Sequence, residues 1–282
     1  MTHRSNQAAD PHSAEPPHHE TVLERTDWAS LATPYGTGAS LPAALARLID
    51  PDPRVREAAV HNALGGVTHQ NSIYEATMPV ALYAAAILDH PVLAEDGFRH
   101  DDATSRGRPT LVSILDWLGE TAYDADGTCV AVDERTYGEG SLDEEMRAFR
   151  ELRPVIFSAV RALLGHDHPE VRNTALVAAI PLIEHPALTV QSDLTGHAHR
   201  LLATSTDRYH RDRVLDALKA WGHDTTDLEG TRPTSRPANG TPPSEPHEVP
   251  GTVSGRATAA TAKTRRSDCC AGTSARGGRR RP

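Results

Sequence analysis

The sequence predicts an all-α fold, a right-handed α-solenoid built from antiparallel helix pairs, and one recurring motif carries most of that prediction. In the motif a short polar residue precedes a proline, and a Val-Arg pair follows within the first helical turn. The polar residue suits the N-cap and the proline suits the first helical position, so each copy should open a helix. The copies comprise Asp52, Pro53, Val55 and Arg56, and then His168, Pro169, Val171 and Arg172.

The spacing of these copies is the second observation. Small apolar residues recur every three or four positions behind each proline, which is typical of a helix packed closely against a neighbour. A weaker third copy contains Arg211, 39 residues after Arg172. The first two copies lie 116 residues apart, near three such periods. HEAT and armadillo units repeat every ~40–47 residues.

The amino-acid composition is consistent with stacked helices, and the charge of the chain limits the class of partner that it can bind. Aromatic residues make up only 4% of the chain, so Leu, Val, Ile and Ala must build the core. Residues 225–282 hold ten Arg or Lys and five Asp or Glu, which leaves residues 1–224 with a net charge of −14. An acidic body repels phosphate backbones, so we expect a cationic or neutral partner and no nucleic acid.

The chain divides into three parts by composition. Residues 1–20 and the Pro/Thr/Arg-rich tail 225–282 lack apolar periodicity and should be disordered. Residues 21–224 should form the repeat domain, with polar loops near 95–108 and 124–140. No apolar run approaches the ~20 residues of a membrane span, and the N-terminus lacks a signal peptide, so we expect a cytoplasmic protein without a membrane partner. The preference for Arg over Lys is typical of a GC-rich, actinobacterial coding bias.

In the first half of the domain, Trp28, Leu31 and Tyr35 should cap the first repeat, before a turn over residues 34–38. Helices are expected over residues 40–49 and 53–65, on either side of the first motif copy. Ser72 and Glu75 have the spacing of a capping box for a helix over 76–88, in which Pro79 should cause a bend or a fresh start.

In the second half, Pro109 should start an amphipathic helix that ends near Tyr123 and carries Trp117 on its flank. Ser141 should N-cap a helix that Pro154 kinks or divides. Further helices are expected over residues 169–184, 193–203 and 207–221, the last closed by Gly222. The predicted core face of the helix that Pro109 starts is Leu111, Val112, Leu115 and Leu118.

The motif copies at Pro53 and Pro169 resemble HEAT repeats, which are armadillo-like. The wider resemblance is to actinobacterial HEAT-repeat proteins and covers about residues 26–221. It rests on Asp27-Trp28, Tyr35-Gly36, Asp52 to Arg56, His69-Gln70, Tyr74 to Thr77 and Pro79. It implies a protein-interaction scaffold with no catalytic residues to transfer, and some proteins of this sort occur near toxin genes.

One polar cluster is the candidate partner-binding site: His69, Gln70, Tyr74 and Glu75. It falls at a turn between repeats, where binding residues are often placed. The alternative is that His69 and Gln70 hydrogen-bond the ends of neighbouring helices and satisfy backbone groups there.

Catalytic and metal-binding interpretations are weaker. The His166-Asp167-His168 and His197-Ala198-His199 triplets suit zinc or iron, but a closed site needs three or four convergent ligands. The His-Glu pairs of deoxyhypusine hydroxylase, a HEAT-repeat di-iron enzyme, occur here only in the expected disordered ends. Asp143 to Glu145 form a solvated first turn, Cys129 has no identifiable base, and the Arg-rich end from Arg276 to Arg281 is a solvated tail. We therefore expect no catalytic residues, metal or cofactor.

Three functions follow from these observations. The first is a non-enzymatic scaffold or adaptor that binds another protein with a basic surface. The second, which is a specific form of the first, is an immunity protein that neutralises a basic toxin. The third is a HEAT-like enzyme of the DNA glycosylase, lyase or metal-hydroxylase type, which the acidic domain disfavours.

Overall fold

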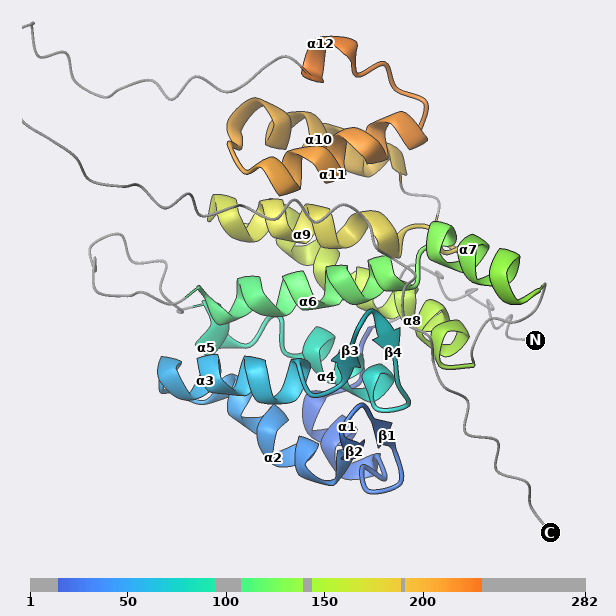
Figure 1. The fold of residues 1–282 in the computed structure, drawn as a ribbon. Coiled ribbons are helices and arrows are strands. Elements are labelled where there is room, and N and C mark those ends of the chain that lie inside the picture. Colours follow the sequence, from blue (N-terminus) through green and yellow to red (C-terminus); the bar gives the residue numbers. More distant parts are fainter. Residues whose placement is uncertain (1–14, 95–107, 139–143, 189–190, 230–282) are drawn as a thin grey trace, which may run out of the picture.

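The computed structural model describes residues 15–94, 108–138, 144–188 and 191–229. Most of these residues are helical, and the strands form two short hairpins, so the predicted all-α class is confirmed. The helices stack in layers, from α1 and α2 at one end to α10, α11 and α12 at the other (Figure 1). The expected disordered residues 1–14 and 230–282, most of the 95–108 loop, and Ser141 lie outside the described residues.

The N-terminal part contains both hairpins. Its elements in chain order are α1 (His19–Arg25), β1 (Ala32–Thr33), β2 (Gly36–Thr37), a 3-10 turn (Gly38–Ser40), α2 (Leu41–Ala46), a second 3-10 turn (Arg47–Ile49), α3 (Pro53–Ala59), a π-helical turn (Val60–Leu64), β3 (Thr68–His69), β4 (Ser72–Ile73), α4 (Thr77–Ala86) and α5 (Pro91–Ala94).

The described residues of the C-terminal part contain helices joined by turns, and no strand. Its elements are α6 (Thr110–Asp124), α7 (Gly127–Tyr137), α8 (Glu144–Arg161), a 3-10 turn (Ala162–Gly165), α9 (Pro169–Leu182), α10 (Gln191–Thr204), α11 (Arg208–Ala220) and α12 (Thr226–Glu229).

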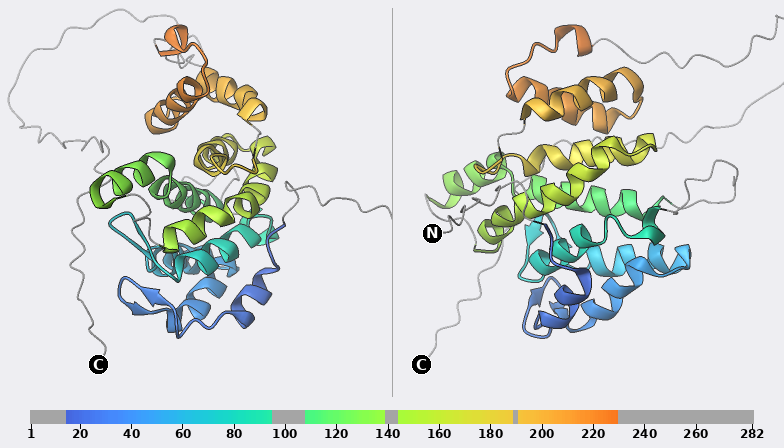
Figure 2. Two further views of the ribbon diagram at one scale, coloured as in Figure 1. Left: turned by 90° about the vertical axis from the view of Figure 1, so that its right-hand side faces the viewer. Right: turned by 180° about the vertical axis from the view of Figure 1, so that it is seen from behind.

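One connected cluster of buried apolar side chains runs through the stack, from Val22 in α1 to Leu218 in α11. Helix α6 packs most extensively against α9, α4 packs against α8, and α9 also contacts α8 and α11 (Figure 2). Helices α6 and α9 approach closely at Gly119, where an added Cβ would lie 2.9 Å from the Cα of Ala178. A small residue is needed there because α6 and α9 touch through their backbones.

The motif copies begin α3 and α9, as predicted. Asp52 is the N-cap of α3, and its side chain accepts a hydrogen bond from the Arg54 N–H at 2.9 Å. Pro53 and Pro169 are the first residues of their helices, and Val171 is fully buried. Val55 is only partly buried, because α3 lies nearer the surface than α9.

An arginine at the fourth helical position ties each of these helices to the turn before it. Arg56 donates to the carbonyls of Asp50 at 2.6 Å and Pro51 at 3.1 Å. Arg172 donates to the carbonyls of His166 at 3.4 Å and Asp167 at 2.7 Å. The bonds satisfy carbonyl groups that the end of the preceding helical segment leaves open.

The third copy repeats the arrangement at α11. Asp207 caps α11 by accepting from the His210 N–H at 2.8 Å, and Arg211 donates to the carbonyls of Ser205, at 3.3 Å, and Leu202. Two residues before each N-cap, a side chain accepts from the N-cap N–H; these acceptors are Asp50, His166 and Ser205. The three copies therefore share the bond to the N-cap N–H and an arginine that donates to the carbonyl six residues before it.

Several expectations about the N-terminal elements were wrong. Residues 19–25, part of the expected disordered segment and of the lead-in to Trp28, form helix α1, whose Val22 joins the core. Ser72 caps no helix, because it lies in β4, and α4 begins at Thr77. There the Thr77 hydroxyl donates to the Val67 carbonyl and accepts from the Tyr74 N–H. Pro79, in the first turn of α4, marks the fresh start that the sequence allowed.

The segment 124–140 is not a polar loop, because helix α7 occupies residues 127–137. Asp126 caps it by accepting from the Cys129 N–H at 2.7 Å, and the Glu184 carboxylate accepts from the Gly127 N–H at 2.8 Å. Helix α8 runs through Pro154 without dividing, so of the two outcomes expected there, a kink or a division, the division is wrong.

Candidate functional site

The two hairpins lie side by side at one edge of the helix stack (Figures 1 and 2). The Glu75 carboxylate, just after the second hairpin, accepts from the Ala32 N–H in the first hairpin at 2.8 Å. The Ala76 N–H donates to the Ala32 carbonyl at 3.2 Å. These bonds fix the first hairpin against the second. They are needed because a hairpin with strands of only two residues is not stable by itself.

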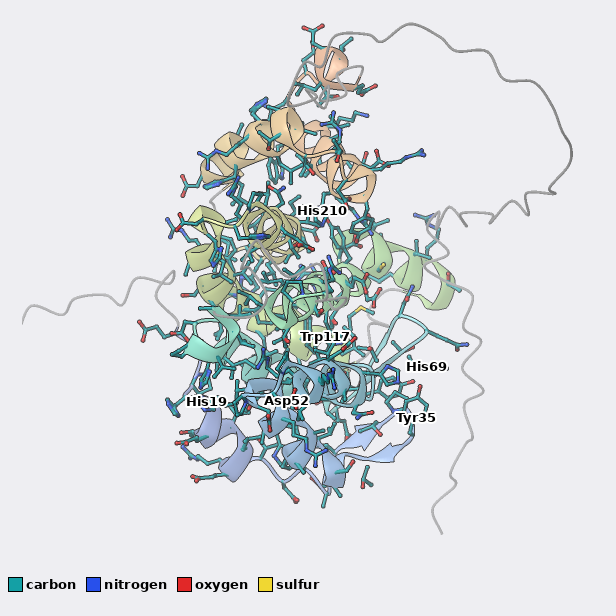
Figure 3. The ribbon with its side chains drawn as sticks, turned by 90° about the vertical axis from the view of Figure 1, so that its left-hand side faces the viewer. His19, Tyr35, Asp52, His69, Trp117 and His210 are labelled. Carbon is teal, nitrogen blue, oxygen red and sulfur yellow. The ribbon has the colours of Figure 1, made fainter. Side chains whose placement is uncertain are left out.

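The hairpin turns bring two aromatic rings together. The rings of Tyr35, in the first turn, and His69, at the end of β3, meet edge to face with centroids 6.0 Å apart (Figure 3). Tyr35 is 73% exposed, so it does not cap the first repeat as its sequence position suggested. Trp28 has that role: it is buried, and its indole N–H donates to the Leu23 carbonyl at 3.0 Å.

The second turn has an uncommon backbone conformation. His69 pairs with Ser72, which leaves Gln70 and Asn71 as a two-residue loop. Their φ angles are +50° and +61°, as a type I′ turn requires at both central positions. Asn tolerates this left-handed region, whereas Gln rarely adopts it. The fold therefore holds Gln70 in a strained conformation at the tip of the hairpin.

This turn forms one wall of a recess of about 130 Å³, and helix α6 forms the other. Its lining residues are Thr68, His69, Gln70 and Asn71 from the hairpin and Trp117, Glu120, Thr121 and Asp124 from α6.

The α6 residues follow one face of the helix. Their spacing of three, four and seven residues after Trp117 places them in line along α6, beside the face that carries the predicted core residues Leu111, Leu115 and Leu118. Trp117 is partly buried, and its indole nitrogen, which is buried, has no hydrogen-bond partner among the described residues.

The two carboxylates of the recess are those of Glu120 and Asp124. Among the described residues, neither Glu120 nor Asp124 makes a hydrogen bond or an ion pair. The pKa of Asp124 is raised from 3.8 to about 7, mainly by burial and then by the charges of Glu120 and Asp126, although Arg213 acts in the opposite direction. The Arg213 guanidinium instead lies over the Tyr123 ring, 3.9 Å from its centroid. The recess is therefore acidic and incompletely compensated.

Of the four predicted partner-binding residues, the structure brings His69 and Gln70 to the recess and leaves Tyr74 and Glu75 outside its lining. Glu75 holds the two hairpins together, and Tyr74 is partly buried behind them. No hydrogen bond from the His69 or Gln70 side chain to a helix end is present in the described part of the chain. The structural alternative, that they satisfy helix ends, therefore gains no support.

The α6 side of the recess was not predicted from the sequence. Trp117, Glu120, Thr121 and Asp124 form a recognisable polar stripe, but the helix was expected to fade at Tyr123 and Asp124 was assigned to a loop. The sequence does not show that the second hairpin packs beside this stripe. From the sequence alone, the stripe therefore has the pattern of an ordinary solvated helix face.

The histidines of the two triplets contact neighbouring residues of the fold. The His166 ring accepts from the His168 N–H at 3.1 Å, and His168 is the N-cap of α9. His197 and His199 point along different directions of α10, and the His199 ring instead meets that of His223. Within the described ranges, no group of three or more His, Cys, Asp or Glu side chains is placed to hold a metal ion.

The remaining candidates also fall into helices. Glu144 and Glu145 begin α8, and Asp143 lies outside the described residues. Cys129, expected in a loop, is buried in the first turn of α7, and its thiol lies 3.5 Å from the Tyr123 carbonyl. None of the helices described here has the length and apolar character that crossing a membrane would require.

Comparisons of this chain with protein-family models, with curated proteins and with solved structures found no match, so its structure alone supports the functional argument.

Proposed function

We propose that the chain is a non-enzymatic interaction module, a right-handed solenoid of HEAT-like helix pairs that binds another protein. The three motif copies support the repeat interpretation. At the start of α3, α9 and α11 alike, the N–H of the N-cap residue donates to a side chain two residues earlier, and the arginine at the fourth helical position donates to the carbonyl six residues before it. The single connected core also supports the repeat interpretation, since stacked repeats share one interior.

One observation carries the choice of binding surface: the hairpin edge, defined here as Tyr35, His69, Gln70 and the adjacent recess. Tyr35 is the most exposed large apolar side chain among the described residues. Exposed aromatic side chains on loops are characteristic of protein-binding surfaces, because they offer contact area at low conformational cost. The strained Gln70 turn is also typical of a site kept for function.

The test replaces Tyr35 in the full chain with a photo-crosslinking phenylalanine derivative and irradiates the protein in its native cell. The matched control places the same group at Tyr209, an aromatic residue on α11 that is 45% exposed. We expect one protein to be captured from position 35 and not from position 209. That protein, once purified, should bind the unmodified chain and lose affinity when Tyr35 is changed to Ala.

Three results would contradict the proposal or a part of it. Equal capture at both positions would show non-specific contact, and a captured protein that binds the Tyr35→Ala variant as well as the original would place the interface elsewhere. Turnover of a small molecule by the purified chain would contradict its non-enzymatic part.

A further inference from the structure

We propose that the recess between the second hairpin and α6 binds the guanidinium group of an arginine side chain from the partner protein. This inference rests on the proposed function, and it adds the chemistry by which the hairpin edge recognises its partner. It follows from the shape of the recess, its acceptors, its aromatic walls and its charge.

The recess suits the end of one long side chain. Its volume of about 130 Å³ is too small for a folded element or a cofactor of nucleotide size. Its lining residue His69 meets the exposed ring of Tyr35 (Figure 3), so the recess lies beside the surface on which a docked protein would place a side chain.

The polar groups of the recess are mainly hydrogen-bond acceptors. Glu120 and Asp124 are one helical turn apart on α6 and offer two carboxylates to the same space. The amide oxygens of Gln70 and Asn71 can accept from the opposite wall, provided by the turn. An arginine has five N–H donors in a planar fork, and it can therefore bond both walls at once.

Aromatic surface is also present. Trp117 lies on the α6 wall, and the Tyr35–His69 pair lies at the hairpin. A guanidinium group stacks on such rings and is more weakly hydrated than an ammonium group, so that it loses less on leaving water. Both features favour arginine over lysine in this recess.

The surroundings of Asp124 disfavour its charged form. Burial has the largest effect in raising the pKa of its carboxyl, Glu120 on the same helix and Asp126 just beyond it raise it too, and Arg213 on α11 opposes them. His69 is the further titratable group in the lining. Because Arg213 lies over Tyr123, the cost of holding two carboxylates together is not removed within the described part of the chain. A bound guanidinium would remove it.

The experiment titrates the full chain with an acetylated and amidated Gly-Arg-Gly peptide and follows the indole N–H signals of the three tryptophans by NMR. The Trp117 signal should shift in a saturable manner. The Trp28 signal should stay unchanged, because its N–H is bonded to Leu23. A Gly-Lys-Gly peptide should bind more weakly, and a neutral Gly-Gln-Gly peptide should cause no shift.

The double variant Glu120→Gln/Asp124→Asn keeps the shape of the recess and removes its charge. We expect its affinity for the arginine peptide to fall by about tenfold or more. Glu24→Gln/Glu57→Gln is the matched control, because it removes two exposed helical carboxylates far from the recess and should bind as the original does. If the double variant fails to fold, the single change of the exposed Glu120 to Gln gives the same test with a smaller loss.

The dependence of the peptide affinity on pH provides a second readout. Affinity should rise as the pH increases from about 6 to about 8, because Asp124 then loses its proton. The single variant Asp124→Asn should lose most of this dependence. A pH dependence that persists in this variant would assign the effect to His69 and contradict the role of Asp124.

Each failure has a separate meaning. An unmoved Trp117 signal, an equal response to the neutral peptide, or an unchanged affinity in the double variant would overturn guanidinium binding. If Tyr35 still captures a partner in that case, the proposed function stands without this recess. If Tyr35 captures nothing although the arginine peptide binds, the recess chemistry stands and the hairpin edge is not the protein interface.

Discussion

Arg56 and Arg172 lie 116 residues apart, yet each donates hydrogen bonds to the backbone carbonyls five and six residues before it. Arg211 bonds the carbonyl six residues before it in the same way. The arginine therefore acts as a bridge between a helix and the turn that leads into it. Because the turn is what orients each helix relative to the previous one, the bridge helps to fix how successive layers stack.

Replacing Arg56 with Met should lower the free energy of unfolding by about 2 kcal/mol, because two carbonyls lose a charged donor in a buried position. Arg54→Met, two residues earlier on the exposed side of α3, should change it by less than about 0.5 kcal/mol. Urea denaturation of both variants measures the difference. Similar losses in the two variants would contradict the bridging role.

Gly119→Ala should destabilise the protein by about 1–3 kcal/mol, since the new methyl group would lie 2.9 Å from the Ala178 backbone. Gly196→Ala, in a helical position with nothing within 4 Å of the new methyl group, should stabilise it by up to about 1 kcal/mol. Thermal melts should therefore move in opposite directions. A neutral or stabilising effect at position 119 would mean that α6 and α9 separate easily.

Gln70→Gly should raise the free energy of unfolding by up to about 1 kcal/mol, because glycine adopts the left-handed conformation of the turn without strain. Asn71→Gly is the control and should gain less, since asparagine already tolerates positive φ. Denaturation midpoints compare the two. A loss of stability on changing Gln70 would show that its side chain makes a stabilising contact that outweighs the strain.

Asp124→Asn should remove a pH dependence of stability. In the folded chain the pKa of Asp124 is about 7, whereas its ordinary value is 3.8, so between these values the folded state holds a proton that the unfolded state releases. The stability of the original protein should therefore fall as the pH rises from about 4 to about 7 and then level off.

The variant lacks this group, so its stability relative to the original should increase across the same pH range. Denaturation of both proteins at a series of pH values measures the difference. A difference that is constant with pH, or that shrinks as the pH rises, would show that Asp124 keeps an ordinary pKa.

The sequence was most informative where local chemistry decides the structure. Asp52 and Pro53 specify the start of α3, and Asp207 the start of α11, because the cap and the first turn involve only nearby residues. Gly222, with φ of +83°, closes α11 as expected. The third motif copy, although it lacks the proline, was also correctly aligned through Arg211.

The hairpins were missed because two-residue strands are too short to show alternation of polar and apolar residues. The turn at Pro34 and Tyr35 was recognised, but its exposure was not, because the Glu75 carboxylate that fixes the hairpin comes from 43 residues away. Helix α7 was missed for a similar reason: one of its first N–H groups is satisfied by Glu184, beyond the reach of any local pattern.

The sequence by itself determined the helical class, the motif copies and two residues of the candidate site, His69 and Gln70, because caps, prolines and apolar spacing act over a few residues. Only the tertiary structure decided that these residues face Trp117, Glu120 and Asp124 across a recess. That juxtaposition depends on packing between segments about 50 residues apart, and the raised pKa of Asp124 depends in turn on the burial that the packing creates.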